Sequence, residues 1–171
     1  MTQNNLFQYA TKELSQDAML CWMINWINYP DSPLHSLGID ALNLFLHNSC
    51  KEYFSVEVKR QYKKIDVLIL FNDDQALIIE DKTNSSEHSD QIRRYQKLME
   101  EEFPNQNIHT AYIKTGIIYD EDACILEKAN VITLDDLLSL LQPYAKKGYS
   151  DILEDYFDYL VSIADERKKN R

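Results

Sequence analysis

Two short apolar runs separated by a polar tetrapeptide constrain the fold more than any other part of the chain. The runs are Val67–Phe71 and Ala76–Ile79, and the tetrapeptide between them is Asn72–Gln75. Runs rich in β-branched residues with turn chemistry between them are typical of a β-hairpin. Because an antiparallel hairpin brings its outer ends together, the sequence predicts that Asp66 and Glu80 lie side by side.

The length of the hairpin loop decides which face each acidic side chain takes, because side chains alternate along a strand. A two-residue loop pairs Asp66 with Asp81 and leaves Glu80 on the other face. A three-residue loop, Asn72–Asp74, pairs Asp66 with Glu80. That second register also puts Lys82 on the shared face and points the Asp81 side chain away.

Two carboxylates at one end of an apolar hairpin are unfavourable, because like charges repel and each group loses hydration. A divalent cation removes that cost, and Mg2+ is typically held by one or two carboxylates with waters and phosphate oxygens. A nearby amine such as Lys82 can orient the attacking water or stabilise charge on a phosphate. These residue types together indicate metal-assisted hydrolysis of a phosphodiester.

The same residues resemble a known signature. Asp66 followed by Glu80-Asp81-Lys82 resembles the D…(D/E)-x-K signature of the PD-(D/E)XK nuclease superfamily. The proline that gives this signature its first letter is absent, and Ile65 precedes Asp66. A triplet of this kind is common by chance, so strand context and further elements carry the resemblance.

Two further segments extend the resemblance. Gln91-x-x-x-Tyr95 is similar to the Q-x-x-x-Y element that follows the signature in the exonuclease-like branch. The stretch from Phe7 to Ala18 resembles the N-terminal helix of bacterial members, which contributes one more acidic residue, here Glu13. From the residues alone, the better reading of Glu13 is a solvated charge on a polar helix face, and the resemblance is what favours a role at the site.

The resemblance implies an α/β fold with a restriction-endonuclease-like core of order αβββαβ, in which helices flank a central mixed sheet of four to five strands. It implies a metal-dependent nuclease that uses Mg2+ or Mn2+. The implied catalytic residues are Asp66, Glu80, Lys82, Gln91 and Tyr95. The implied metal ligands are Glu13, Asp66, Glu80 and, through its backbone carbonyl, Asp81.

The implied partner is nucleic acid, with DNA expected before RNA, and similar small bacterial nucleases occur in phage defence, mobile elements and DNA repair. A second hypothesis is a catalytically silent nuclease-like domain that acts as a nucleic-acid-binding or protein-assembly module. The net charge of −10 favours this second hypothesis, because non-specific nucleic-acid binding depends on basic residues, whereas the intact triad opposes it. A third is an unrelated α/β protein whose acidic hairpin ends are merely solvated.

Length and composition set the remaining bounds. A chain of 171 residues that is 44% hydrophobic is expected to form one domain over 1–171 with a proper core. No basic-then-apolar leader and no apolar stretch of about 20 residues is present, so we expect a cytoplasmic protein without a membrane partner. Three widely spaced cysteines suggest neither zinc nor a disulfide framework. A homodimer or a larger complex stays open.

Apolar periodicity predicts the other elements. Helices are expected over Ser15–Asn28, Leu34–Cys50, Asp90–Phe103, Glu121–Ala129, Thr133–Leu141 and Asp151–Ala164, with a frayed tail over Glu166–Arg171. Strands are expected over Tyr53–Lys59, His109–Thr115 and Val131–Thr133, the second of them parallel to an earlier strand because a helix intervenes. The basic segment Lys59–Lys64 is expected to be a turn, and it reads either as a solvated loop or as a phosphate-binding rim beside the metal site.

Overall fold

The computed structural model describes residues 4–10, 13–82, 91–116 and 129–169, with the side chains of residues 13 and 14 left aside. Its helices are η1 (Leu6–Gln8), α1 (Glu13–Asn25), η2 (Trp26–Asn28), α2 (His35–Leu46), α3 (Gln91–Glu102), α5 (Leu134–Leu141) and α6 (Asp151–Lys169). Its strands are β1 (Glu57–Tyr62), β2 (Ile65–Phe71), β3 (Gln75–Asp81), β4 (Asn107–Lys114) and β5 (Asn130–Thr133).

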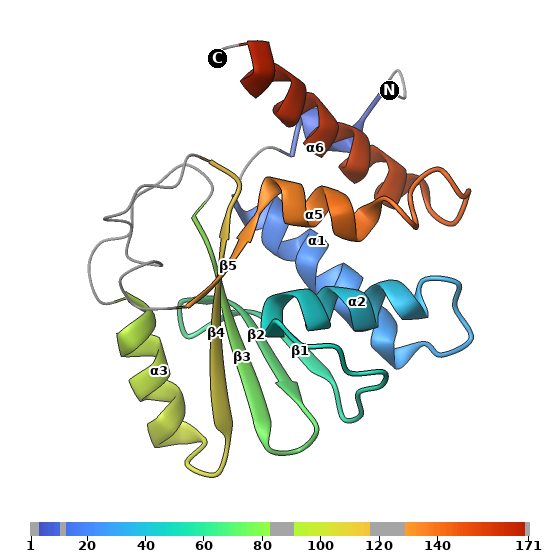
Figure 1. Ribbon diagram of the computed structural model, residues 1–171. Helices are drawn as coiled ribbons and strands as arrows, with labels where there is room; N and C mark the ends of the chain where they lie inside the picture. The colour runs from blue at the N-terminus through green and yellow to red at the C-terminus, as the bar shows by residue number, and fades with distance from the viewer. Residues whose placement is uncertain (1–3, 11–12, 83–90, 117–128, 170–171) are drawn as a thin grey trace.

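The strands form one mixed sheet in the order β1-β2-β3-β4-β5. Strand β2 is antiparallel to both of its neighbours, β1 and β3, and β3, β4 and β5 are parallel. Helix α3 connects β3 to β4 and, among the helices that the structure describes, is the one on its face of the sheet, whereas α1, α2, α5 and α6 lie toward the other (Figure 1). This is the predicted α/β fold with a mixed sheet of five strands, and the predicted parallel pairing of β4 is confirmed.

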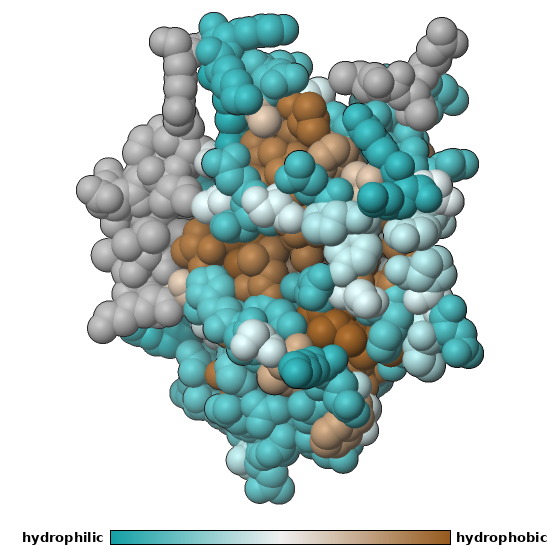
Figure 2. Space-filling view, turned by 45° about the vertical axis from the view of Figure 1, so that its right-hand side comes forward, coloured by the Kyte–Doolittle hydropathy of each residue, from teal (hydrophilic) through white to brown (hydrophobic). Residues whose placement is uncertain are grey.

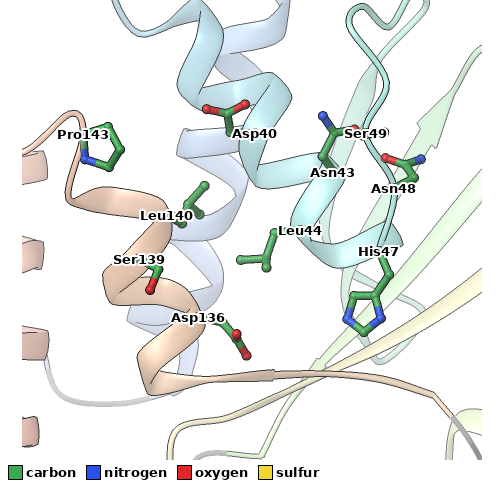
Figure 3. Close-up of a pocket in the computed structure, with 10 residues that line it drawn as sticks. All are labelled: Asp40, Asn43, Leu44, His47, Asn48, Ser49, Asp136, Ser139, Leu140 and Pro143. Atoms are coloured by element: carbon green, nitrogen blue, oxygen red, sulfur yellow. The ribbon is translucent and has the colours of Figure 1, made fainter.

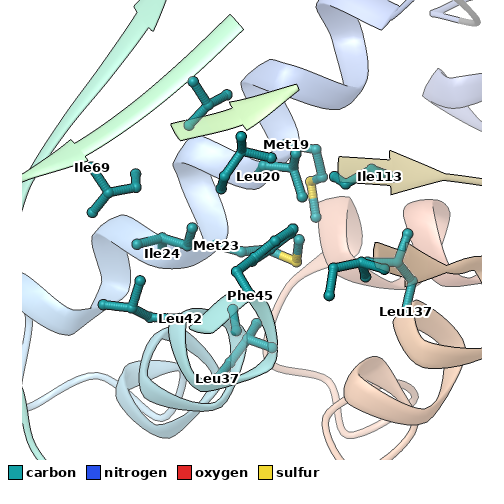
Figure 4. Packing of buried hydrophobic residues seen from close by; sticks show 14 of the residues in the cluster. Met19, Leu20, Met23, Ile24, Leu37, Leu42, Phe45, Ile69, Ile113 and Leu137 are labelled. Atoms are coloured by element: carbon teal, nitrogen blue, oxygen red, sulfur yellow. The ribbon is translucent and has the colours of Figure 1, made fainter. Parts of the chain in front are cut away.

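Each face of the sheet has its own core, which explains why β2 and β3 are almost continuously apolar. On the helical face, Ile69 and Ile113 pack with α1, α2 and α5 side chains such as Met23, Phe45 and Leu137 (Figure 4). On the other face, a smaller cluster includes the buried residues Leu68, Ala76, Ile78 and Met99, the last from α3. Full burial of one such Leu or Ile side chain contributes about 1.5–3 kcal/mol.

The β2–β3 hairpin has the three-residue loop and not the two-residue loop. Phe71 pairs with Gln75, which leaves Asn72–Asp74 as a three-residue loop. Asn72 and Asp73 have φ angles of 52° and 65°, a left-handed conformation that Asn and Asp tolerate better than most residues. The register predicted by the three-residue loop is therefore confirmed, and Asp66 and Glu80 point to the same face.

Two predicted boundaries near the N-terminal half were wrong. Helix α1 begins at Glu13, not at Ser15. Strand β1 begins at Glu57 and continues to Tyr62, so only Lys63 and Lys64 form the turn that had been expected over the whole basic segment. A charged sequence forms this strand because it lies at the edge of the sheet, where charged side chains reach solvent.

Two helix ends also differ from prediction. Helix α2 ends at Leu46 because His47 takes a left-handed conformation, with φ of 50°, and its N–H caps the helix. Helix α6 continues to Lys169 instead of fraying near Glu166, and its last turn carries three basic residues that suit the negative end of the helix dipole. The helix predicted around Glu121 falls on residues 117–128, outside the described ranges. Within those ranges, no helix has both the length and the apolar character that crossing a bilayer requires.

Candidate active site

Asp66 and Glu80 meet at one end of the β2–β3 hairpin, on the face that α3 covers. The backbone N–H of Asp66 donates a hydrogen bond to Glu80 Oε1 at 3.3 Å. The backbone N–H of Asp81 donates to Asp66 Oδ2 at 3.1 Å. Main-chain donors therefore fix both carboxyl groups in place, because each bond depends only on the hairpin register.

Glu80 is fully buried, at 0% exposure, and its protonation state is shifted. Burial, followed by the negative charge of Asp66, raises the pKa of Glu80 from 4.5 to about 9, while the charge of Lys82 acts in the opposite direction. Without a cation the glutamic acid therefore keeps its proton at neutral pH. In a low-dielectric site without a compensating cation, one of two neighbouring acids is held in its neutral form.

Helix α3 supplies the next two residues. Gln91 Nε2 donates to Glu80 Oε2 at 3.3 Å and to Tyr95 Oη at 2.8 Å. Gln91 and Tyr95 are neighbours because residues four apart share a helix face. Burial raises the pKa of Tyr95 above 10.0, so its hydroxyl stays protonated across the physiological range. The crossover helix thus begins with its polar face against Glu80.

Lys82 follows β3 directly. Its backbone N–H donates to the carbonyl of Ile113 at 2.9 Å, which continues the parallel pairing with β4 by one residue. Alternation along the strand places its side chain on the face of Glu80, and its positive charge lowers the pKa of that residue. Lys82 is half-buried.

The Asp81 side chain lies on the opposite face of the sheet. It is 1% exposed and approaches the buried Tyr156 of α6, whose pKa is raised by burial and, next, by the charge of Asp81. The structure therefore brings Asp66, Glu80, Lys82, Gln91 and Tyr95 together and leaves the Asp81 carboxylate out. Ligation of a metal by the Asp81 backbone carbonyl stays a prediction.

Helix α1 contributes an acidic residue that sequence reasoning missed. Glu13 begins α1, but its side chain lies outside what the structure describes, so its role as a ligand stays a prediction. One turn later Asp17 is buried, at 1% exposure. Gln61 Nε2 donates both to Asp17 Oδ2 at 3.3 Å and to Asp66 Oδ1 at 3.4 Å, which links α1 to the acid pair through β1. Asp17 lies three residues before the buried Leu20 on the same helix face, and this spacing in the sequence could have predicted that Asp17 is buried. No pattern in the sequence predicted the role of Gln61.

The donor set fits a hard divalent cation. Among the described residues, no group of three or more His, Cys, Asp and Glu side chains is close enough to form a metal cluster. Mg2+ does not require one, because it is commonly held by one or two carboxylates while waters fill the remaining positions. Asp66 and Glu80 are two oxygen donors on one face, and the raised pKa of Glu80 marks a position where positive charge would be stabilising.

A pocket elsewhere in the molecule is a weaker candidate for catalysis. It has a volume of about 560 Å³ and lies between α2 and α5, on the helical side where apolar side chains gather within polar surroundings (Figures 2 and 3). Its two carboxylates already have structural partners. Asp136 caps α5 through Thr133, and Asp40 accepts a hydrogen bond from Tyr144.

Comparison with known proteins identifies the family. No curated protein and no solved structure matches the chain. The sequence profile of the PD-(D/E)XK nuclease superfamily matches residues 4–169, which include every element of the sheet and the acid pair. With its five-stranded mixed sheet and flanking helices, the chain therefore belongs to the PD-(D/E)XK nuclease superfamily and has a restriction-endonuclease-like fold.

Proposed function

We propose that the protein is a metal-dependent nuclease that hydrolyses phosphodiester bonds of nucleic acid, with DNA as the first candidate substrate and RNA as the second. The observation that carries the proposal is the contact among Asp66, Glu80 and Gln91 on one face of the sheet. Burying Glu80 against the half-buried Asp66 is unfavourable for folding, and perturbed acids of this kind gather at functional sites.

In this proposal Asp66 and Glu80 hold Mg2+ or Mn2+, with Glu13 and the Asp81 carbonyl as further ligands. A divalent cation supplies Lewis acidity, lowering the pKa of the attacking water and neutralising charge on the phosphate. The Lys82 ammonium orients that water or stabilises negative charge on phosphorus. Gln91 keeps the Glu80 carboxyl oriented, and Tyr95 fixes the Gln91 amide in turn.

The second candidate is a nuclease-like domain without catalysis, acting as a nucleic-acid-binding or assembly module. The excess of 28 acidic over 18 basic residues favours the assembly form of this candidate, because negative net charge opposes tight binding of long duplexes. The two candidates differ in whether the chain cleaves nucleic acid, because a module without catalysis gives no metal-dependent cleavage for Lys82 to assist.

The test is cleavage of labelled single- and double-stranded DNA and RNA with Mg2+, with Mn2+ and with EDTA. We expect metal-dependent cleavage by the wild type and a loss of about 10²–10³-fold in kcat for Lys82→Ala, the range seen when one transition-state donor is removed. Asp66→Ala should abolish metal-dependent cleavage. Lys97→Ala is the matched control, because Lys97 is an exposed lysine on α3. An absence of metal-dependent cleavage on every substrate would support the silent module.

A further inference from the structure

The end of the β1–β2 hairpin concentrates positive charge in an acidic protein. Lys59, Arg60, Lys63 and Lys64 fall within six consecutive positions, in a chain whose net charge is −10. We call these four residues the basic hairpin. Arg60, Lys63 and Lys64 are exposed.

The basic hairpin lies at the same end of the sheet as the acid pair. Its turn, Lys63-Lys64, is followed by Ile65 and then by Asp66 itself. Gln61, in the middle of the basic hairpin, donates to Asp66 Oδ1 at 3.4 Å. A phosphate held near Asp66 and Glu80 therefore lies close to the start of β2 and the turn before it, one strand from the edge of the sheet.

The backbone of this turn is unfavourable for lysine. Tyr62 pairs with Ile65, so the turn has two residues, and Lys63 and Lys64 have φ angles of 48° and 74°. Two-residue turns with positive φ at both positions strongly favour Asn-Gly, because residues with a larger side chain are strained there. Strained backbone that persists in a native protein is found most often at functional sites.

Two of the four cations have local partners on the surface. Lys63 pairs with Glu102, and Lys59 pairs with Glu57 at 3.1 Å. Lys59 also lies 5.5 Å from the centre of the Tyr62 ring. Ion pairs on the surface contribute little to stability, so they do not offset the strain of two left-handed lysines.

We propose that the basic hairpin binds the phosphate backbone of the nucleic-acid substrate on one side of the scissile phosphate. This inference rests on the proposed function for its choice of ligand. The contacts are electrostatic and independent of base sequence, because lysine and arginine at a hairpin tip neutralise phosphates and release counterions. They position the strand and leave the chemistry to the acid pair.

The test is equilibrium binding of a fluorescent single-stranded and a fluorescent duplex DNA in EDTA, where hydrolysis does not proceed. The variant is Lys63→Asn/Lys64→Gly, which gives the turn the residues that its geometry favours. We expect the Kd to rise about five- to tenfold at 0.1 M salt, and the slope of log K against log salt to fall by about 1–2. The melting temperature should stay constant or rise, because the strain is relieved.

The matched control is Lys146→Asn/Lys147→Gly. Both lysines are exposed on the connection between α5 and α6, and Lys146 also has a left-handed φ, of 59°. This control removes the same amount of charge from a different surface of the protein. If the location of the charge matters, the Kd and the salt slope should stay within about twofold of the wild type. An equal loss in both variants, or no change in the hairpin variant, overturns the inference, as does an absence of DNA binding by the wild type.

The outcomes separate the two proposals. If the hairpin variant loses DNA affinity while no cleavage is detected for the wild type, the surface stands and the nuclease assignment fails. If the wild type cleaves DNA and the hairpin variant binds it normally, the nuclease assignment stands and the surface fails. Because binding is measured in EDTA, neither result depends on the metal.

Discussion

Glu80 and Asp81 are adjacent acidic residues on β3, and both are buried, at 0% and 1% exposure. They nevertheless have different surroundings. Glu80 faces α3, where it meets the backbone N–H of Asp66 and the amide of Gln91. Asp81 faces the large helical core, where its charge acts on Tyr156, and its backbone N–H donates to Asp66.

The difference between these two residues follows from the two-residue period of a strand, which sends neighbours to opposite sides of the sheet. Burial alone therefore does not identify a catalytic acid. Glu80 is surrounded by groups that can share a ligand, namely another carboxylate, an amide and an ammonium. Asp81 faces the tyrosines of α6: burial and then the charge of Asp81 raise the pKa of Tyr156, and burial, the charge of Glu166 and then that of Asp81 raise the pKa of Tyr159.

The largest expected effect separates the two acids by activity. Glu80→Gln keeps the shape of the side chain and removes its charge, so we expect metal-dependent cleavage to fall about 10²–10⁴-fold. Asp81→Asn changes a side chain on the far face and leaves its backbone carbonyl in place, so cleavage should stay within about fivefold of the wild type. The measurement is the single-turnover rate at saturating Mn2+. Similar losses in both variants would remove the functional distinction between the two faces.

Much of this arrangement was predictable from the sequence because it depends on short-range patterns. The apolar runs predicted the hairpin, and the three-residue loop predicted the face shared by Asp66 and Glu80. Gln91 and Tyr95 are four residues apart on one helix, so their contact follows from helical spacing. These placements agree with the structure, and the catalytic roles of the residues stay predictions.

The rest depends on contacts that no local pattern encodes. Strand β1 has little apolar alternation after Val58, and its pairing is decided by its edge position in the sheet. Gln61 reaches Asp17 and Asp66 from a left-handed backbone, with φ of 54°, which a sequence reading does not assign to a glutamine. Three distant segments meet there, so only the folded chain reveals the link.

The second prediction concerns stability without metal. The pKa of Glu80 is raised from 4.5 to about 9, so between these values the folded protein binds more protons than the unfolded chain. Stability therefore falls as pH rises through this window, and we expect the free energy of unfolding to drop by up to about 5 kcal/mol from pH 5 to pH 9 through this group. Urea unfolding in EDTA measures it, with Glu80→Gln losing this pH dependence and Asp81→Asn retaining it.

Addition of Mn2+ extends this second test. A cation that binds only the folded protein stabilises it by mass action, and it replaces the proton on Glu80. We therefore expect Mn2+ to raise the melting temperature more at pH 8 than at pH 6 in the wild type, and to have little effect on Glu80→Gln. If the effect of Mn2+ on the melting temperature depends on pH equally in the wild type and in Glu80→Gln, the group that exchanges its proton for the cation is not Glu80.

The smallest effect concerns the other face. Tyr156 is 1% exposed, and among the residues that the structure describes its hydroxyl group has no hydrogen-bond partner. A buried hydroxyl group without a partner loses its hydrogen bonds to water on folding and gains none in the protein. Tyr156→Phe should therefore raise the free energy of unfolding by about 0.5–1 kcal/mol. It should leave cleavage unchanged, because Tyr156 approaches Asp81 and not Glu80. Thermal unfolding and a cleavage assay on one preparation check both statements. A clear loss of cleavage in a stable Tyr156→Phe protein would mean that the helical core reaches the acid pair through Asp81, and that the two faces of β3 act together.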